Sequence, residues 1–503
     1  MNSLKTFVKT HPLLAVMIAA VLVRLAAVIW SRGFIHSDDH FDTISVAWSW
    51  CQDGLWGADG WLRWKHKLSD TIGRFPLYNL FLAFQMQLCR WLGISSLSEM
   101  MYVIRGTHAL ISLLPVWAAY KIALTATRSA RWAVAAGLAI GLHFALPFLG
   151  VRNLIEAVGG SLWLVAVWYL YRYMNDRRTS GLYLAGLWAG LAWMIRFQVA
   201  FAILPVPFLL WWGTHRIRPA LHFSAAVGGM LLASGFADWA LLGTFAGSTI
   251  TNLTMNTGLD ALYRTIPLLY VVLLLLMLVP PISFGLPFLI LRPSFIRSQA
   301  VLFWTSASFL LFHSLHSNQQ ERFIFPIIPA FVVLAVLAVW AYVETRAPAR
   351  WPRWLTMTLW TSAGVNLVLG AFFTFAYGHR GMIEPLRWFE SHTPTAHVVF
   401  LQPEVKRWVP IEYAGNQLWY ECIRSWEELK AWPIDLPDPR GIDYFVVYPK
   451  SDSELSVYLD SLNIRFGPLE PVFQVEPSYY DEALHRLNPR HNDNYAAFVF
   501  RPR

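Results

Sequence analysis

Long apolar segments alternate with short polar ones over most of the chain. Many of them approach the roughly 20 residues that a helix needs to cross a bilayer. They lie near residues 12–31, 101–126, 131–150, 153–172, 180–196, 198–214, 219–242, 265–291, 298–315, 323–345 and 355–377. The pattern predicts a mainly α-helical, polytopic membrane protein with about 11 transmembrane helices.

Residues 75–94 form a different kind of segment. Gln85, Gln87 and Arg90 interrupt its apolar residues, so polar and apolar faces alternate along it. We expect an amphipathic helix that lies at the membrane interface instead of crossing it.

The charges of the loops support this choice. With the N-terminus in the cytoplasm, every second loop is short and basic, as the positive-inside rule requires. Counting 75–94 as a span would invert every later loop. The prediction places the first long loop (32–100), the loop 243–264 and the C-terminus outside the cytoplasm. The basic residues are Lys5, Lys9, Arg128, Arg131, Arg172, Arg177, Arg178, Arg216, Arg218, Arg292, Arg297, Arg346, Arg350 and Arg353.

From about residue 378 the apolar runs shorten to the length of strands, and charged residues and prolines become more frequent. We expect strands at 397–401, 444–448 and 497–500, and helices at 382–391 and 451–462. The predicted organisation is a transmembrane domain over 1–378 and a small α/β domain over 379–503 outside the membrane. Interfacial helices are expected in the first outer loop, 32–100.

Composition agrees with a membrane protein. The chain is 56% hydrophobic and only 14% charged, whereas about a quarter of a soluble protein is charged. The net charge of +9 is explained by the cytoplasmic loops, so we expect no nucleic-acid partner. A cleaved signal peptide is an alternative for the first segment. Arg24 within it, and the lack of a small-residue cleavage site, argue against that alternative.

An acidic motif, residues 36–41 (His-Ser-Asp-Asp-His-Phe), follows the first span directly. A desolvated carboxylate is costly unless it is paired or used. Asp38 and Asp39 therefore suggest a group that holds a cation or takes a proton from a substrate hydroxyl at the bilayer surface. The alternative is that they solvate the helix end or pair with Arg24.

Further polar residues gather at the predicted outer ends of the other helices. Carboxylates beside several arginines suggest a site for an anionic, lipid-borne substrate. Alternatively, some of the arginines anchor the interface, some carboxylates only neutralise them, and the histidines are packing residues. The residues are Arg74, Arg152, Asn153, Glu156, Arg196, Gln198, Asp238, His313, His316, Asn318, Gln319, Gln320, Glu321 and Arg322.

Seven short segments of the sequence, taken in order, are more specific together than any one of them alone. They are residues 33–41, 73–78, 152–156, 196–198, 238–256, 322–326 and 380–384. In these segments the chain resembles the GT-C mannosyltransferases that use polyprenyl-phosphate-linked mannose, a family that includes the GPI-anchor enzymes and their N-glycan relatives. The resemblance runs from about residue 20 to the C-terminal domain.

The sequence departs from the family pattern in three respects. Ser37 replaces a proline and Asp39 replaces a glutamate, so the motif keeps its carboxylates but its turn can differ. The family's His-Lys-Glu before Arg-Phe is Asn-Gln-Gln at 318–320, and His316 or Glu321 is a possible substitute.

The resemblance implies an inverting transfer of a hexosyl group, in particular mannosyl, from a polyprenyl-phosphate donor to a hydroxyl of a lipid-linked or cell-envelope glycan. Asp38 would be the base and Asp39 would support it, while arginines such as Arg196 and Arg322 would stabilise the leaving phosphate. No metal is required, although the two aspartates are a possible site for a divalent cation. The candidate substrate-binding residues are His36, His40, Arg74, Arg152, Glu156, Arg196, Gln198, His316, Glu321 and Arg322.

Alternative functions remain at this point. A different sugar or a protein acceptor is possible, and so is a transporter or flippase of a lipid-linked sugar. Transporters often contain repeated halves and polar sites at the midplane, whereas this sequence shows no repeat and its polar residues lie at helix ends. The lack of long eukaryotic-style loops suggests a bacterial inner membrane with a periplasmic active site.

Overall fold

The chain forms two compact units in the computed structural model. The structure describes residues 6–7, 9–53, 75–259, 266, 268–316, 319–345, 351–401, 409–425, 427–428, 441–449, 451–489, 492 and 494–503. The first unit comprises Met1–Val28, Trp61–Phe81 and Arg105–Thr374. The second comprises Ile29–Gly60, Leu82–Ile104 and Phe375–Arg503.

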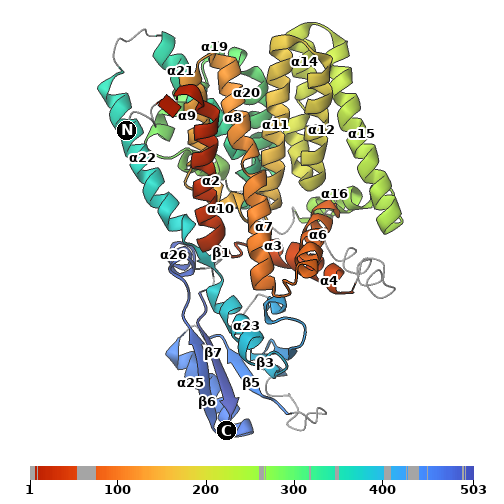
Figure 1. The fold of residues 1–503 in the computed structure, drawn as a ribbon, viewed down its shortest axis with the longest axis vertical. Coiled ribbons are helices and arrows are strands. Elements are labelled where there is room, and N and C mark those ends of the chain that lie inside the picture. The colour runs from red at the N-terminus through yellow and green to blue at the C-terminus, as the bar shows by residue number, and fades with distance from the viewer. Residues whose placement is uncertain are drawn as a thin grey trace. The chain divides into compact units, whose positions relative to one another are not determined.

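The first unit is a bundle of helices, in which α11, α12 and α15 run side by side (Figure 1). Residues of α6 (Leu77–Trp91) and α7 (Leu97–Ile111) are divided between the units. The remaining helices of the bundle are α2 (Pro12–Trp30), α8 (Leu114–Thr127), α9 (Ala130–Gly141), α10 (Leu146–Gly150), α11 (Ile155–Asp176), α12 (Thr179–Ile195), η2 (Phe197–Val199), α13 (Ala200–Ile203), α14 (Val206–Thr214), α15 (Ile217–Leu242), α16 (Gly247–Leu259), α17 (Leu269–Met277), α18 (Ile282–Ile290), α19 (Pro293–Ser298), α20 (Ala300–Leu315), η3 (Glu321–Ile327), α21 (Ile328–Thr345) and α22 (Arg353–Thr374).

Several of these helices are long and apolar enough to cross a bilayer. Among the described residues there are six such stretches, or seven if α17 and α18, which meet at a bend of 113°, count as one broken span. The protein is therefore a mainly helical integral membrane protein, while the total of about 11 spans remains a prediction. The six stretches are Pro12–Trp30, Leu97–Thr127, Phe197–Thr214, Ile217–Leu241, Glu321–Glu344 and Arg353–Thr374.

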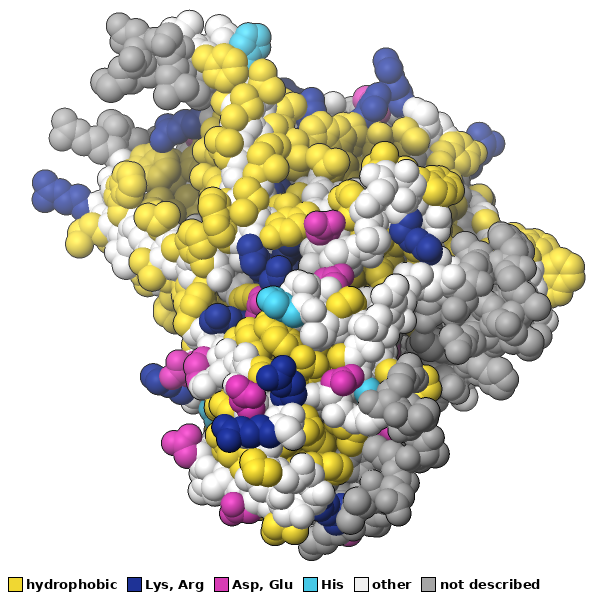
Figure 2. All heavy atoms as spheres, turned by 60° about the horizontal axis from the view of Figure 1, so that its bottom comes forward, with side chains coloured by type: hydrophobic (Ala, Val, Ile, Leu, Met, Phe, Trp, Pro, Cys, Tyr) yellow, Lys and Arg dark blue, Asp and Glu magenta, His cyan; other side chains and the backbone are white. Residues whose placement is uncertain are grey.

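The surface of the bundle is rich in large apolar side chains, which cover much of the upper part of the face in Figure 2. Phe288, Trp360 and Leu367 are each more than 70% exposed. A patch of this kind on a water-facing surface would favour aggregation, so it is best explained as the surface that contacts lipid.

Helix α2 has one face towards lipid and one towards the bundle. Leu14, Ile18 and Leu22 recur every four residues and are exposed, whereas Ala20 and Arg24 are buried. The Arg24 guanidinium donates to the Ser112 hydroxyl (2.7 Å) and to the carbonyls of Ser112, Gly141 and Ala20. These bonds explain its burial without a carboxylate partner, so pairing with the acidic motif is not needed.

Helix α22 satisfies backbone groups at two breaks in neighbouring helices. The Asn366 amide accepts the Phe144 N–H (2.8 Å) and donates to the Leu142 carbonyl (2.7 Å) between α9 and α10. One turn earlier, the Ser362 hydroxyl accepts the Ile282 N–H and donates to the Val279 carbonyl, where α17 and α18 meet. Backbone groups at membrane depth need such partners because lipid offers none.

The second unit contains a five-stranded sheet in the order β4-β3-β5-β7-β6. Strands β4, β3 and β5 are parallel, and β7 is antiparallel to both of its neighbours. All three expected strands and both expected helices form. The elements are β3 (His397–Leu401), β4 (Trp419–Ile423), β5 (Tyr444–Val447), β6 (Leu469–Val475), β7 (Ala497–Pro502), α23 (Arg380–His392), η4 (Ile411–Ala414), α25 (Asp452–Phe466) and α26 (Tyr479–Leu487).

Residues that follow the first span also belong to the second unit. Strand β1 (Arg32–Gly33) pairs in parallel with β2 (Tyr377–Gly378), and α3 (Ser37–Asp39), η1 (His40–Ile44) and α4 (Ser45–Asp53) follow. Gly33 has a φ of +74°, and a Cβ there would lie only 1.8 Å from the Gly378 carbonyl oxygen. Glycine is therefore required where the chain enters the acidic motif.

Candidate active site

Three buried charges meet in the first unit. The Glu156 carboxylate lies 3.3 Å from the Arg196 guanidinium and 4.0 Å from that of Arg322. The exposed fractions of the three residues are 1%, 8% and 4%. Two guanidinium groups thus share one carboxylate in a site largely closed to water.

The positions of the three charges follow from where their helices begin and end. Glu156 lies in the first turn of α11, where the helix dipole favours a carboxylate, and Arg196 follows the last residue of α12, where it favours a cation. Gly160 allows η3, which contains Arg322, to approach α11. A Cβ at Gly160 would lie 2.5 Å from the Pro326 carbonyl oxygen.

Polar and aromatic neighbours hold the two guanidinium groups. The Phe323 ring lies 5.0 Å from Arg196 and 5.5 Å from Arg322, distances at which a cation is attracted to a ring. The Gln320 side chain accepts a hydrogen bond from Arg322 Nε (2.9 Å), and the Tyr270 hydroxyl donates to the Gln320 carbonyl (3.2 Å). The arginines are thus positioned without a second carboxylate among these neighbours.

His313 in α20 lies beside this network. Its Nδ1 donates to the Phe309 carbonyl (2.9 Å), its ring stacks on Phe309, and the Tyr270 ring is 6.4 Å away. Its Nε2 is buried and has no hydrogen-bond partner among the described residues. Because Nδ1 carries the proton in that bond, Nε2 of the neutral ring is a buried acceptor.

The other candidates in this unit lie in less uniform surroundings. Arg152 is buried, with its guanidinium 4.5 Å from the Phe148 ring. Gln198, in η2, is half-buried, and His316 is half-buried at the end of α20. Glu321 is exposed although its neighbour Arg322 is buried.

The acidic motif lies in the second unit. Asp39 is buried, and its carboxylate accepts the His36 N–H (3.3 Å) in a capping box around the short helix α3. Asp39 therefore stabilises the turn that presents its neighbour. The side chain of Asp38 and the whole of Arg74 lie outside the described residues.

His40 is enclosed by the C-terminal part of the chain. Its Nε2 donates to the Glu412 carboxylate (3.2 Å), and its ring stacks between those of Phe34 and Tyr413. Burial alone would raise the pKa of Glu412, but the hydrogen bond from His40 lowers it. These contacts give His40 a structural role that its position in the motif did not reveal.

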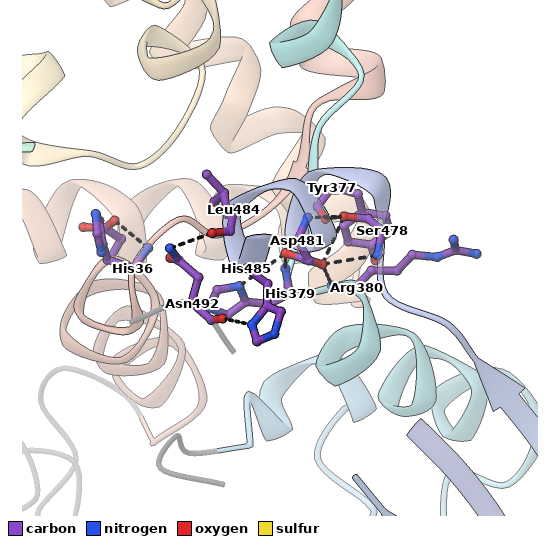
Figure 3. Close-up of polar contacts among 10 residues, drawn as sticks. His36, Tyr377, His379, Arg380, Ser478, Asp481, Leu484, His485 and Asn492 are labelled. Carbon is purple, nitrogen blue, oxygen red and sulfur yellow. Dashed lines mark hydrogen bonds and ion pairs between the residues drawn. The ribbon is translucent and has the colours of Figure 1, made fainter. Parts of the chain in front are cut away.

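A second buried carboxylate in this unit is Asp481 (Figure 3). It accepts the backbone N–H groups of His379 (2.8 Å), Arg380 (3.2 Å) and Ser478 (3.4 Å), together with the Ser478 hydroxyl (3.0 Å). One carboxylate thus caps the first turns of both α23 and α26. Burial would raise the pKa of Asp481, but the hydrogen bonds from His379 and Arg380 lower it.

The part of the chain that the structure describes contains no group of three or more histidine, cysteine or acidic side chains placed to hold a metal ion. The Asp38 side chain is not part of that set.

The profile of the Alg9-like mannosyltransferase family matches residues 15–399. The chain belongs to this family. The family assignment confirms the resemblance derived from the sequence, and it makes the protein a membrane glycosyltransferase of the GT-C type. No curated protein matches the chain.

Two solved structures of ArnT from Cupriavidus metallidurans have a similar fold. The one with undecaprenyl phosphate bound is 12% identical, covers 98% of each chain and gives a TM-score of 0.58. The apo form is 13% identical, covers 97% of each chain and gives a TM-score of 0.56. At this level of identity the similarity concerns the fold alone.

Sequence reasoning selected all three members of the Glu156–Arg196–Arg322 cluster. It did not select Phe323 or Tyr270. It placed Gln320 and His313 in the outer polar cluster, but it did not name them as substrate-binding residues and treated His313 as a possible packing residue. Phe323 follows Arg322 directly in the sequence, but nothing in the sequence indicated that its ring would lie near both guanidinium groups.

Proposed function

We propose that this glycosyltransferase moves a hexosyl group, specifically mannosyl, from a polyprenyl-phosphate donor to a hydroxyl group. The acceptor is a lipid-linked or cell-envelope glycan. The first unit binds the donor phosphate through Arg196 and Arg322, and Asp38 of the acidic motif is the general base. The family supports mannose, because its name is that of a mannosyltransferase family.

The observation that carries this proposal is the pair of buried guanidinium groups beside Glu156. Planar guanidinium groups bind phosphate oxygens well, so two of them in one buried site suit the phosphate of the donor. ArnT, whose fold is similar, was solved with undecaprenyl phosphate bound, which supports the same class of donor.

The reaction is a single displacement. Asp38 takes the proton of the acceptor hydroxyl while its oxygen attacks the anomeric carbon, and the bond from that carbon to the phosphate breaks. Attack from the face opposite the leaving group inverts the anomeric configuration. Arg196 and Arg322 stabilise the charge that develops on the departing polyprenyl phosphate, so the proposal requires no divalent cation.

Two residues assist without transferring a proton. Asp39 holds the turn next to Asp38 through its bond to the His36 N–H. The His313 Nε2 atom, which has no hydrogen-bond partner among the described residues, accepts a hydrogen bond from a hydroxyl of the bound sugar. This bond offsets the free-energy cost of burying an acceptor without a partner.

The loop charges support an orientation for the enzyme. The basic loops lie in the cytoplasm, and the acidic motif and the C-terminal region lie on the opposite face, the periplasm of a bacterial inner membrane. Residues 379–503 form a periplasmic domain that helps to bind the acceptor.

The test uses purified full-length protein in lipid nanodiscs with a panel of polyprenyl-phosphate sugars. We expect consumption of the mannose donor in the presence of glycolipid extracts, the opposite anomeric configuration in the product, and no effect of a chelator. Consumption of another sugar, or transfer to protein, would replace the proposed substrate. Movement of the donor across the membrane without consumption would support a flippase.

A matched pair of variants tests the charge argument. Glu156→Gln removes the shared carboxylate charge, whereas Arg196→Ala removes one of the two guanidinium groups. We expect the first to retain donor binding, although it loses the carboxylate that positions the arginines, and the second to raise the KM for the donor strongly. Equal donor affinity in wild type and Arg196→Ala would contradict phosphate binding at this cluster.

A further inference from the structure

The first unit contains a cavity that lies far from the Glu156 cluster. Its volume is about 680 Å³, and residues of α8, α11, α18, α19, α20 and α21 line it. Tyr171, one of these residues, lies 15 positions beyond Glu156 along α11. At 1.5 Å per residue this separates the two sites by roughly 22 Å. The cavity therefore belongs to the opposite end of the bundle, which the loop charges assign to the cytoplasm.

Two exposed arginines line this cavity and have no acidic partner among the residues that the structure describes. Arg292 donates to the Phe288 carbonyl (3.2 Å) and its guanidinium lies 5.9 Å from the Tyr342 ring. Arg297 forms no hydrogen bond or ion pair with any residue that the structure describes. Among the described lining residues Glu344 is the one carboxylate, so arginine charge predominates over acidic charge there.

The rest of the lining has two chemical characters. Gln299 is only 4% exposed and provides a fixed polar point, because it accepts the Tyr171 hydroxyl (2.7 Å) and donates to the Ser298 hydroxyl (3.3 Å). The remaining wall is mainly apolar and consists of Leu289, Phe295, Val301, Ala338 and Trp340 with smaller side chains. A free anion would leave this apolar wall unused.

We propose that the cavity binds one anionic phospholipid of the membrane leaflet at this face. The phosphodiester lies between Arg292 and Arg297, and the upper part of an acyl chain lies along Phe295, Val301 and Ala338. Basic pockets between transmembrane helices have this combination of a charged mouth and apolar walls. The site is separate from the proposed transfer reaction, and it couples the helices that line it to the composition of the membrane.

The experiment titrates delipidated full-length protein with phosphatidylglycerol and detects bound lipid by native mass spectrometry. Phosphatidylcholine and inorganic phosphate are the comparison ligands. We expect one tightly bound phosphatidylglycerol, weaker binding of phosphatidylcholine and no competition by inorganic phosphate. The double variant Arg292→Ala/Arg297→Ala should weaken the tight binding roughly 10- to 30-fold.

The matched control is Arg216→Ala/Arg218→Ala. These two exposed arginines lie in another predicted cytoplasmic loop and do not line the cavity, so the change in net charge is identical. Equal weakening by both double variants would mean that the lipid is held only by the general basic surface, which would overturn the proposal.

A second variant tests the apolar wall. Ala300 lies in the first turn of α20 and lines the cavity, so Ala300→Trp reduces its volume and leaves both arginines in place. We expect loss of the tightly bound phosphatidylglycerol with little change in thermal unfolding. Undiminished lipid binding in this variant would show that no acyl chain enters the cavity. Competition by inorganic phosphate alone would replace the lipid with a free anion.

Discussion

Glu156 in the first unit and Asp481 in the second are both almost completely buried, yet their partners differ. Asp481 accepts three backbone N–H groups and a hydroxyl, so the local structure satisfies it. Glu156 is held by two guanidinium groups, which are side chains able to bind an anion as well. A carboxylate satisfied by backbone groups is explained by stability, whereas buried arginines gathered around a carboxylate suit a site that binds an anionic substrate.

A histidine of each unit shows the same difference in how its hydrogen-bonding groups are satisfied. In the second unit, Glu412 binds His40, and aromatic rings enclose the imidazole. In the first unit, His313 keeps a buried acceptor without a partner among the described residues. Burial alone therefore does not identify a functional residue. The kind of partner that each buried polar group has says more about its function than its burial does.

The largest expected effect is the loss of activity on substitution of Asp38. Such a loss would mean that the second unit takes part in the reaction as well as in the fold. We expect Asp38→Asn to fold and insert normally and to lose about 10²- to 10⁴-fold in kcat, since general base catalysis is removed. Asp39→Asn is the control, because the amide oxygen still accepts the His36 N–H. If both variants lose activity equally, or Asp38→Asn remains active, Asp38 is not the base.

Removing a guanidinium from the cluster should have the next largest effect. We expect Arg322→Ala to lower kcat/KM by about 10²- to 10³-fold because less charge stabilises the leaving phosphate. Its thermal unfolding should fall only modestly, because Arg196 remains beside Glu156 in the variant. The exposed Arg218→Ala should leave both quantities unchanged. A loss of stability that accounts for the loss of activity would make Arg322 a structural residue.

Gly160 tests how closely the elements of the cluster must approach. Gly160→Ala should displace η3, because the new Cβ would lie 2.6 Å from the Pro326 Cα atom as well as close to its carbonyl. We expect a loss of about 1–3 kcal/mol in stability together with reduced activity. Gly228→Ala in α15 meets nothing within 4 Å and should be neutral or stabilising. Full activity in Gly160→Ala would mean that the position of Arg322 is not critical.

The smallest effect concerns pH and Asp481. The pKa of Asp481 is lower in the folded protein than in an unfolded chain, so its contribution is complete above about pH 4. It is lost as the pH falls through the folded pKa. We expect Asp481→Asn to cost about 1 kcal/mol at neutral pH and progressively less below pH 4, as followed by thermal unfolding. The exposed Asp460→Asn should show no such trend. A constant cost at every pH would exclude the carboxylate charge as the cause.

Much of this architecture was predictable because membranes impose simple rules on sequence. The apolar length of α2, α15 and α22 indicated helices that can cross a bilayer, and the alternating strand-length runs indicated β3, β5 and β7. The family phrases also identified the enzyme class. The contacts of individual side chains were harder to predict from the sequence. Glu321 and Arg322 are neighbours, and the sequence predicted both as substrate-binding residues. Only Arg322 is buried, because η3 turns the two side chains in different directions.

By itself, the sequence determined that this is a polytopic membrane glycosyltransferase, because hydropathy, loop charge and motif order are local properties of the chain. Only the tertiary structure decided that Glu156, Arg196 and Arg322 meet while Asp481 caps two helices. These residues are far apart in the sequence, and helix packing, made possible at positions such as Gly160, brings them together. A site made of charges from several helices forms only when those helices pack, so it becomes visible only in the tertiary structure.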